Sequence, residues 1–282
     1  MITVTGATGQ LGRLVIDALL KRVPSGDITA AVRSPEKAAD IAAKGVRIVR
    51  LDYNALETLG PALAGTDRLL IISGNEFGQR VEQYERLIAA AKAAGVGFIA
   101  YTSIINSDGN PMFLGADHKV AEKLIAATGL PHAFLRNSWY NENYLTAFQS
   151  GAAHGAIIGA AGEGRISAAS RADYAEAAAA VLAEGRTGVF ELGGSTAFTM
   201  DELAGFIGDV AGKPVSYVNM APEDYAAQLK GFGVPEGMAG ALADSDKYAA
   251  EGWLFTESRD LETLIGRKST PIAETIKEVL GA

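Results

Sequence analysis

Four residues whose side chains can move protons stand close together in the segment LGADHKVAEK (114–123). They are His118, Lys119, Glu122 and Lys123, which would occupy about one and a half turns of a helix. One interpretation is a catalytic helix, in which His118 donates a hydrogen bond to a developing oxyanion. The alternative is that His118 contacts a cofactor ribose or a backbone group, while the other three form a solvated polar face.

A glycine-rich segment near the start of the chain, TGATGQLG (5–12), has the composition of a dinucleotide-binding loop. Gly6 would permit a sharp turn, Gly9 a close approach of pyrophosphate to the backbone, and Gly12 close packing of the following helix. Backbone N–H groups and the positive end of the helix dipole would then face the phosphates. The sequence therefore predicts cofactor contacts at Gly6, Thr8, Gly9, Gln10, Leu11 and Gly12.

The residue that ends the second expected strand indicates which dinucleotide binds. An NAD-binding loop usually places Asp or Glu there, to hold the ribose 2′-OH. This chain has Arg33, whose guanidinium suits a 2′-phosphate, so NADPH is favoured over NADH. The alternative is a solvated surface arginine. Ser73, Gly74 and Asn75 follow the fourth expected strand and would lie beside the phosphates and ribose.

Aromatic residues gather in LRNSWYNENY (135–144), after the sixth expected strand, where a nicotinamide would lie. Aromatic rings there could form a flat apolar wall for a planar acceptor, with a second wall supplied by the loops after strands four and five. The alternative is ordinary core packing between two lobes. The predicted pocket residues are Phe77, Phe113, Trp139, Tyr140 and Tyr144, and Asn137 is a further candidate for binding the cofactor.

These residues need a framework that brings them to one edge, and the hydrophobic pattern predicts one. Short apolar runs alternate with amphipathic stretches, which is typical of a parallel sheet with helices on both faces. The prediction is a Rossmann-type, doubly wound α/β fold. The expected strands are 2–5, 28–33, 46–51, 68–73, 98–103 and 132–137. The expected helices are 10–22, 35–44, 55–64, 78–95 and 115–128.

The pattern loosens after about residue 150, which predicts two domains with an approximate boundary. Residues 1–150 would form the NADP-binding domain, and 151–282 a smaller α+β lobe on the substrate side, with the lobes interleaved. Within that lobe we expect a helix from about 173, strands at 189–192 and 215–219, and three or four short helices near the end. Thr199 and Glu202 have the spacing of a capping box that opens a further helix.

Composition excludes several classes of function. The 282 residues carry a formal net charge of −8 and no basic cluster, which disfavours nucleic-acid and anionic-membrane partners. There are no cysteines, and none of the three histidines is spaced i, i+4 from another, which disfavours a metal site. A single dinucleotide-binding loop implies that no flavin is bound. With no secretion signal or long apolar run, we expect a cytoplasmic protein. Assembly into a homo-oligomer stays open.

Several segments together resemble the NmrA-like atypical short-chain dehydrogenase/reductases, and most closely their bacterial quinone-reducing members. They are TGATGQLG, AVRSPEKA, KAAGVGFIAYTS, LRNSWYNENY, IIGAAGEG, SRADYAEAAA and GMAGALADSD. Triphenylmethane reductases share much of the pattern. The resemblance implies an NADPH-binding Rossmann domain, a small C-terminal lobe and a quinone-sized acceptor in the cleft. By position it assigns cofactor contacts to Gly6–Gly12, Arg33, Ser73–Asn75, Asn137, Ser138, Trp139 and Tyr140.

The resemblance also shows what this chain lacks. Related extended enzymes carry Tyr-x-x-x-Lys with a Glu four residues after the Lys. Aligning that Glu with Glu122 puts His118 at the Lys position and Leu114 at the Tyr position. Without this acid pair, reduction of isolated ketones is disfavoured and reduction of quinones to stable anions is favoured. A triphenylmethane-dye reductase and an NADP(H)-binding redox sensor without catalysis remain alternatives.

Overall fold

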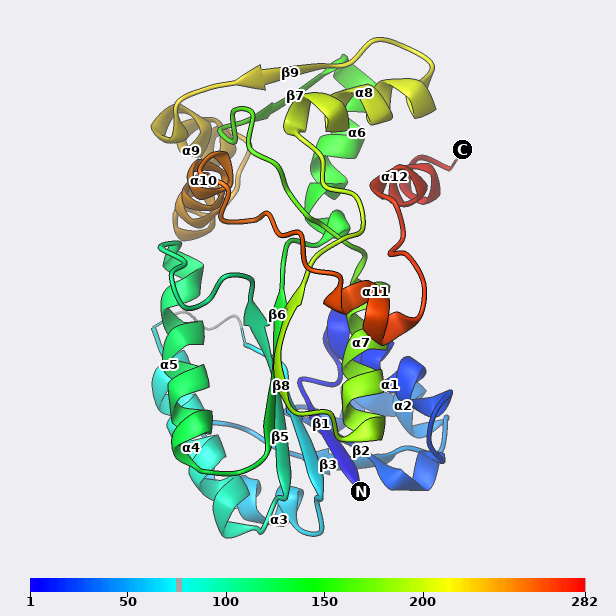
Figure 1. Cartoon of the computed structure of the whole chain (residues 1–282), viewed down its shortest axis with the longest axis vertical. Helices are drawn as coiled ribbons and strands as arrows, with labels where there is room; N and C mark the ends of the chain where they lie inside the picture. The colour runs from blue at the N-terminus through cyan, green and yellow to red at the C-terminus, as the bar shows by residue number, and fades with distance from the viewer. Residues whose placement is uncertain (75–77, 282) are drawn as a thin grey trace. The chain divides into compact units, whose positions relative to one another are not determined.

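The computed structural model describes residues 1–74 and 78–281 (Figure 1). Contacts divide the chain into two compact units that interleave along the sequence. Unit 1 comprises Met1–Ile104, Asp117–Asn137 and Arg171–Phe190. Unit 2 comprises Ile105–Ala116, Ser138–Ser170 and Glu191–Ala282. Across the two described ranges, no helix has the length and apolar character needed to cross a membrane.

Unit 1 is built on a seven-stranded sheet with the order β3-β2-β1-β4-β5-β6-β8. Strands β1 to β6 pair in parallel, which confirms the predicted Rossmann-type fold. The strand order reverses between β1 and β4, so the loops after these neighbouring strands emerge side by side. The strands are β1 (Ile2–Thr5), β2 (Ile28–Val32), β3 (Arg47–Arg50), β4 (Arg68–Ile71), β5 (Phe98–Ile104), β6 (His132–Asn137) and β8 (Gly188–Leu192).

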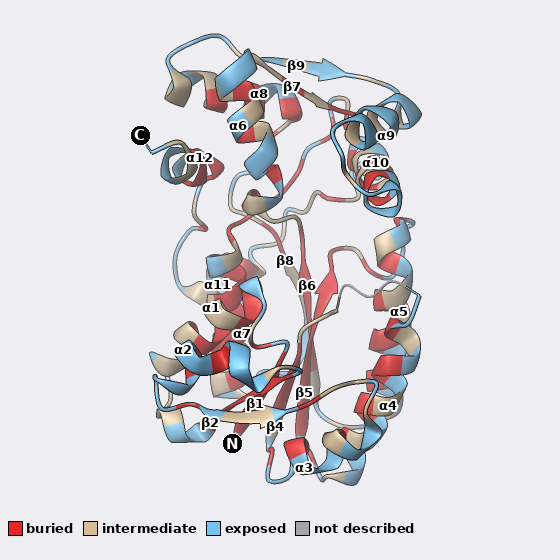
Figure 2. Ribbon diagram, turned by 180° about the vertical axis from the view of Figure 1, so that it is seen from behind, coloured by how far each residue is buried: buried red, intermediate tan, exposed pale blue. Residues whose placement is uncertain are grey.

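Helices cover both faces of this sheet. Figures 1 and 2 show α4 and α5 on one face, with α1 and α7 on the other. A buried apolar cluster that includes Leu69, Tyr84 and Tyr101 lies between the sheet and the helices on the first of these faces. On the other face, α1 and α7 pack directly on each other. The helices are α1 (Gln10–Leu20), α2 (Ala39–Ala42), α3 (Leu59–Leu63), α4 (Arg80–Ala93), α5 (Phe113–Ala127) and α7 (Arg171–Glu184), with 3-10 turns at Ser25–Asp27, Pro35–Ala38 and Leu56–Thr58.

Unit 2 combines a two-stranded parallel sheet with helices. Strands β7 (Ala156–Gly159) and β9 (Ser216–Asn219) pair along their full length. The capping box is confirmed, because the Glu202 N–H donates to Thr199 and the Thr199 N–H donates to the Glu202 carboxylate. The helices are α6 (Leu145–His154), α8 (Met200–Ala211), α9 (Pro222–Gly231), α10 (Glu236–Ala250), α11 (Asp260–Ile265) and α12 (Ile272–Leu280), with a 3-10 turn at Asn141–Tyr144.

The chain crosses between units more often than a boundary near residue 150 implies. Helix α7 and most of β8, expected in the C-terminal lobe, belong to unit 1. Most residues of α7 are buried, so this helix needs apolar partners on several sides, which α1 and the sheet supply. Strand β8 adds to the open edge beside β6. The glycine- and alanine-rich stretch after residue 150 also contains more regular structure than expected, namely the end of α6 and β7.

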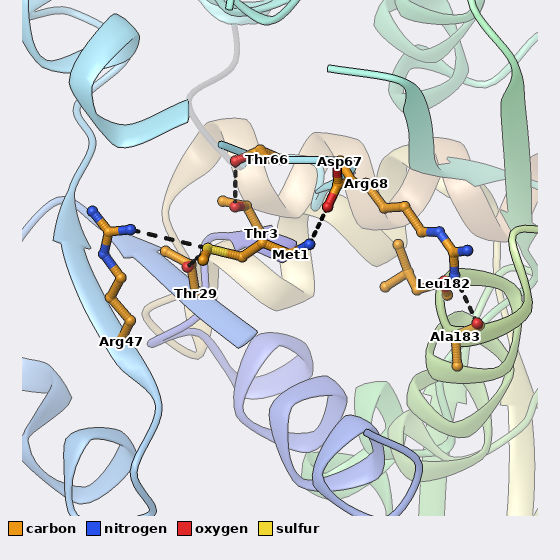
Figure 3. A network of polar contacts seen from close by, with 9 residues as sticks. All are labelled: Met1, Thr3, Thr29, Arg47, Thr66, Asp67, Arg68, Leu182 and Ala183. Carbon is orange, nitrogen blue, oxygen red and sulfur yellow. Dashed lines mark hydrogen bonds and ion pairs between the residues drawn. The ribbon is translucent and has the colours of Figure 1, made fainter. Parts of the chain in front are cut away.

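A polar network at the amino ends of the strands holds α7 to the sheet (Figure 3). The guanidinium of Arg68, on β4, donates from Nη1 to the carbonyl oxygens of Leu182 and Ala183, at 2.5 and 2.6 Å. These carbonyls belong to the last turn of α7, where helix carbonyls lack partners within the helix and the dipole favours a cation. Arg68 therefore anchors a helix more than a hundred residues away in sequence.

Replacing Arg68 with Met should lower the free energy of unfolding by about 2 kcal/mol, because two charge-assisted hydrogen bonds to partly buried carbonyls are lost. Urea unfolding followed by circular dichroism measures the change. Arg186→Ala is the matched control, since it removes an exposed arginine paired with Glu184 at the same helix end and should cost less than about 1 kcal/mol. Equal losses for the two variants would contradict the anchoring role of Arg68.

Candidate functional site

The glycine loop turns tightly between β1 and α1. Gly6 has a φ of 61°, in the left-handed region, and its carbonyl accepts a hydrogen bond from the Gly9 N–H at 2.9 Å. A Cβ added at Gly12 would lie 2.3 Å from the Gly6 carbonyl oxygen, so any side chain there would push α1 off the loop. At Gly9 a Cβ would lie 3.2 Å from the same oxygen. The left-handed φ of Gly6 and the close backbone contact at Gly12 therefore require glycine, whereas the contact at Gly9 is tight without excluding a side chain.

The amino end of α1 presents backbone donors that an anion could use. Gly9 occupies the N-cap position and has no side chain with which to cap the helix, and the first turn carries no acidic residue. Thr8 is half-buried and Gln10 is exposed beside these donors, whereas Leu11 is buried in the core. The unmet N–H groups and the dipole make this a phosphate-binding geometry.

The segment after β4 lies beside the glycine loop and is tied to its neighbours. The Ile72 N–H donates to the hydroxyl of Thr5 on β1, and the Ser73 N–H donates to the hydroxyl of Thr102 on β5. The Gly74 N–H donates to Tyr84 Oη at 3.3 Å, and the Gly74 carbonyl accepts from Arg80 Nε at 2.7 Å. Ser73 and Gly74 are thereby held at the sheet edge. The expected contacts at Asn75 and Phe77 lie outside the described residues.

Arg33 directly follows β2, at the same carboxyl edge as the glycine loop. Its side chain is exposed, and Ser34 and the 3-10 turn Pro35–Ala38 come immediately after it. A guanidinium at this place can meet a phosphate on the ribose of a bound dinucleotide.

Asn137, a further predicted cofactor contact in unit 1, ends β6 opposite Ile104 of β5 and is buried.

His118 lies on α5 inside unit 1 and is only 7% exposed. Its Nδ1 is hydrogen-bonded to the hydroxyl of Tyr101 on β5, at 2.8 Å. Burial, and secondly the nearby Arg80 guanidinium, lower the pKa of His118 to about 3. Burial also raises the pKa of Tyr101 well above its usual value. At neutral pH the pair therefore consists of an uncharged imidazole and an uncharged phenol, which can donate hydrogen bonds but cannot supply a proton as an imidazolium.

The expectation of a solvated polar face is wrong for Glu122. Its carboxylate is buried, and Arg136 on β6 donates to both oxygens, from Nε at 3.0 Å and from Nη2 at 2.6 Å. The hydroxyl of Ser103 on β5 donates to it at 2.6 Å. Glu122 therefore joins α5 to two strands through a buried ion pair. Lys123 is exposed and Lys119 is half-buried, as a solvated face requires.

The aromatic residues expected around the acceptor lie in unit 2, in different environments. Trp139 and Tyr140 are half-buried, in a segment that pairs like a strand with Ala169. Tyr144 is 7% exposed and packs edge to face on Phe198, with ring centroids 5.9 Å apart, so it belongs to the core of unit 2. Phe113 is 59% exposed, and its N–H donates to Asp244 of α10.

Ser138 also contributes to the packing of unit 2. Its N–H donates to the carbonyl of Leu192, and its hydroxyl donates to the carbonyl of Leu254 at 3.0 Å. The predicted cofactor contact at Ser138 therefore has its hydroxyl engaged in the protein interior. The backbone around Ser138 is fixed by these two bonds.

Three residues near His118 were not predicted from the sequence as part of a site. Tyr101 lies inside an apolar strand and Arg136 in another, where side-chain pairing cannot be read from a hydrophobic pattern. Arg80 stands in the first turn of α4, is 5% exposed, and lies 3.5 Å from the carboxylate of Asp117. A cation in the first turn of a helix is unfavourable because it opposes the helix dipole. This position in the sequence could have indicated that Arg80 has a compensating acidic partner.

Potential metal ligands are not grouped in the part of the chain that the structure describes. Over 1–74 and 78–281, no group of three or more His, Asp and Glu side chains is arranged to hold a metal ion. The features that could hold a cofactor are instead the glycine loop, the end of β4 and Arg33. All of them belong to unit 1.

A family model described as NAD(P)H-binding matches residues 6–185, which covers the glycine loop, β2 to β6 and α7. The chain belongs to this NAD(P)H-binding family. It is 47% identical to quinone oxidoreductase 2 of Escherichia coli (strain K12), over 99% of this chain and 98% of that protein. The identification as an NmrA-like oxidoreductase most like the bacterial quinone reductases is thereby confirmed.

Two solved structures extend the comparison to three dimensions. The crystal structure of the NADPH-dependent quinone oxidoreductase from E. coli, complexed with NADPH, matches with a TM-score of 0.97 and 46% identity, covering 99% of this chain and 100% of that chain. The Citrobacter triphenylmethane reductase complexed with NADP(H) matches with a TM-score of 0.95 and 37% identity, covering 99% and 100%. Both relatives share the whole fold of this chain.

Replacing Glu122 with Gln should lower the free energy of unfolding by about 3–5 kcal/mol, because Arg136 would keep its charge in the interior without a counter-ion. Chemical unfolding measures the loss. The matched control is Glu82→Gln, which breaks the exposed Arg86–Glu82 pair on α4 and should cost less than about 1 kcal/mol. A small effect of Glu122→Gln would contradict a buried, ionised pair.

The low pKa of His118 predicts how stability depends on pH. The folded state keeps this imidazole neutral down to a pH of about 3, whereas the unfolded chain binds a proton below about 6.5. Stability from this group is therefore fully present above 6.5 and is lost as the pH falls below it. Relative to His118→Gln, the wild type should lose about 2 kcal/mol between pH 7.5 and pH 5. Unfolding free energies that change in parallel for the two proteins would contradict the burial of a neutral His118.

Proposed function

We propose that this protein is an NADPH-dependent oxidoreductase that transfers hydride directly to a quinone-type acceptor. The observation that carries the proposal is the full-length 47% identity to quinone oxidoreductase 2. The geometry of unit 1 supports it at two places. The first is the glycine loop with Arg33, and the second is the neutral His118 at the position where related enzymes carry a lysine.

The residues of unit 1 suit NADPH. The α1 amino end and the backbone of the glycine loop would bind the pyrophosphate, and the absence of a side chain at Gly12 lets α1 start close enough to the loop for this. Arg33 would bind the 2′-phosphate, and Ser73, Gly74 and Asn137 would contact the ribose and the nicotinamide side. When bound, NADPH supplies a hydride. The protein would orient the dinucleotide and the acceptor for hydride transfer and stabilise the negative charge that develops on the acceptor.

The state of His118 favours an acceptor that can carry negative charge. Hydride addition to an isolated ketone yields an alkoxide whose conjugate acid has a pKa near that of water, about 16, so this reaction needs an acid. Addition to a quinone yields a phenolate-type anion with a pKa of about 10, which can take its proton from water afterwards. An imidazole whose pKa is about 3 offers a hydrogen bond rather than a proton. This limit favours quinone reduction and disfavours the reduction of isolated ketones.

A second acceptor class is favoured by a separate observation. The 37% identity and TM-score of 0.95 to triphenylmethane reductase make cationic dyes a reasonable alternative acceptor. Such a cation is neutralised by hydride and needs no proton at all. The planar acceptor would use the exposed or half-buried rings of Phe113, Trp139 and Tyr140, while Tyr144 serves the core.

The purified protein should oxidise NADPH when simple quinones are added, and should leave isolated ketones unreduced. Loss of NADPH absorbance measures turnover with a panel of quinones, triphenylmethane dyes and ketones. Arg33→Ala should raise KM for NADPH about tenfold with little effect on KM for NADH, because one charge-assisted contact to the 2′-phosphate is lost.

Two results would contradict the proposal in different ways. NADPH binding without turnover of any quinone or dye would indicate a redox sensor of the NmrA type rather than an enzyme. Preference of the wild type for NADH would contradict the role of Arg33, whatever the acceptor. Arg47→Ala, which removes an exposed arginine from the opposite, amino end of the neighbouring strand β3, is the matched control for a general effect of charge.

A further inference from the structure

Arg13 connects the two parts of unit 1 that would hold the phosphates of NADPH. It follows Gly12 on α1, and its Nε donates to the carbonyl of Thr8 within the glycine loop at 3.2 Å. Its Nη2 donates to the carbonyl of Lys37 at 2.9 Å, and its Nη1 forms an ion pair with Asp40. One guanidinium thus bonds both to the loop after β1 and to the segment after β2.

The segment held by Arg13 is the continuation of Arg33. The Lys37 N–H donates to the carbonyl of Ser34 at 3.1 Å, which closes the 3-10 turn that starts one residue after Ser34. The Arg13 bond to the Lys37 carbonyl therefore acts on a closed turn that begins next to Arg33. Movement of this turn relative to the glycine loop would carry Arg33 with it.

We propose that Arg13 is a positioning residue for cofactor selectivity, which sets the distance between the pyrophosphate-binding loop and the 2′-phosphate-binding Arg33. This inference rests on the proposed preference for NADPH. A dinucleotide has a fixed span between its pyrophosphate and its 2′-phosphate, so both contacts form only when the two protein elements are held at the matching separation. NADH lacks the 2′-phosphate, so its affinity should not depend on this separation.

Arginine suits this role better than lysine would. Its planar guanidinium presents donors in a rigid fork, which lets one side chain bond to two carbonyls and a carboxylate at once. Arg13 also compensates the charge of Asp40, whose pKa it lowers below the usual value. Without Arg13, the carboxylate of Asp40, on the segment that follows Arg33, would lose this cationic partner.

The chain contains a matched control for the link itself. Lys44 forms an ion pair with Asp17, and these two residues lie four positions after Asp40 and Arg13 respectively. The two ion pairs therefore join α1 to the same following segment about one helical turn apart. The Lys44–Asp17 pair does not include the glycine loop or the 3-10 turn beside Arg33, so it tests whether any tie between these helices would suffice.

The experiment measures the dissociation constants of NADPH and NADH by isothermal titration calorimetry, on the full chain without acceptor. The variants are Arg13→Ala, Arg13→Lys and Lys44→Ala, each checked for folding by thermal unfolding. Arg13→Ala should weaken NADPH binding about tenfold and change NADH binding less than about twofold. Arg13→Lys, which keeps the charge but loses the fork, should give a smaller loss for NADPH alone. Lys44→Ala should change neither constant more than about twofold.

The inference is overturned if Arg13→Ala weakens both cofactors equally, if NADPH binding is unchanged, or if Lys44→Ala reproduces the loss. If Arg13→Ala does not fold, Arg13→Lys decides by the same comparison. A wild type that binds NADH as tightly as NADPH contradicts the proposed cofactor preference and this inference together. A wild type that prefers NADPH, with variants that keep the preference, contradicts the inference alone. Quinone turnover does not enter the measurement.

Discussion

The rest of the structure depends on how closely α1 approaches the turn after β1. At Gly12 a single added carbon would lie 2.3 Å from the Gly6 carbonyl oxygen, so the helix can start where it does only because no side chain is present. This contact directs unmet N–H groups toward the sheet edge. It also sets α1 where α7 packs on it and where Arg13 reaches the segment after β2. The geometry of the glycine loop and the place of α1 on one face of the sheet thus both depend on one short distance.

The interior of unit 1 is organised around polar groups as well as apolar packing. Glu122 and Arg136 bring opposite charges into the core, and Tyr101 and His118 add a neutral hydrogen-bonded pair beside them. Arg136 binds both oxygens of the Glu122 carboxylate, whereas burial lowers the pKa of His118 to about 3 and keeps the imidazole neutral. His118 on α5 is therefore uncharged at neutral pH and cannot supply a proton as an imidazolium.

Much of unit 1 could be predicted from the sequence because its signals are local. The alternating pattern located β1 to β6 and the helices between them, since each buried parallel strand is a short apolar run. Prediction was weaker wherever the partner is distant. Helix α7 and β8 were expected in the C-terminal lobe, because nothing in their own residues indicates that α1, Arg68 and the edge of β6 are their partners. The Gly- and Ala-rich stretch near 151–164 lacks a clear period, so the end of α6 and β7 were not resolved within it.

The sequence by itself determined the fold class, the dinucleotide-binding loop, the arginine that follows β2 and the absence of the Tyr-x-x-x-Lys pair. Each of these depends on residue types at a fixed local spacing. Only the tertiary structure decided the charge state of His118, the burial of Glu122, the core position of Tyr144 and the link made by Arg13. Each of these depends on which distant side chain occupies the adjacent space. Desolvation and ion pairing act through that space, so residues such as Arg136 and Tyr101 acquire their roles only when the chain has folded.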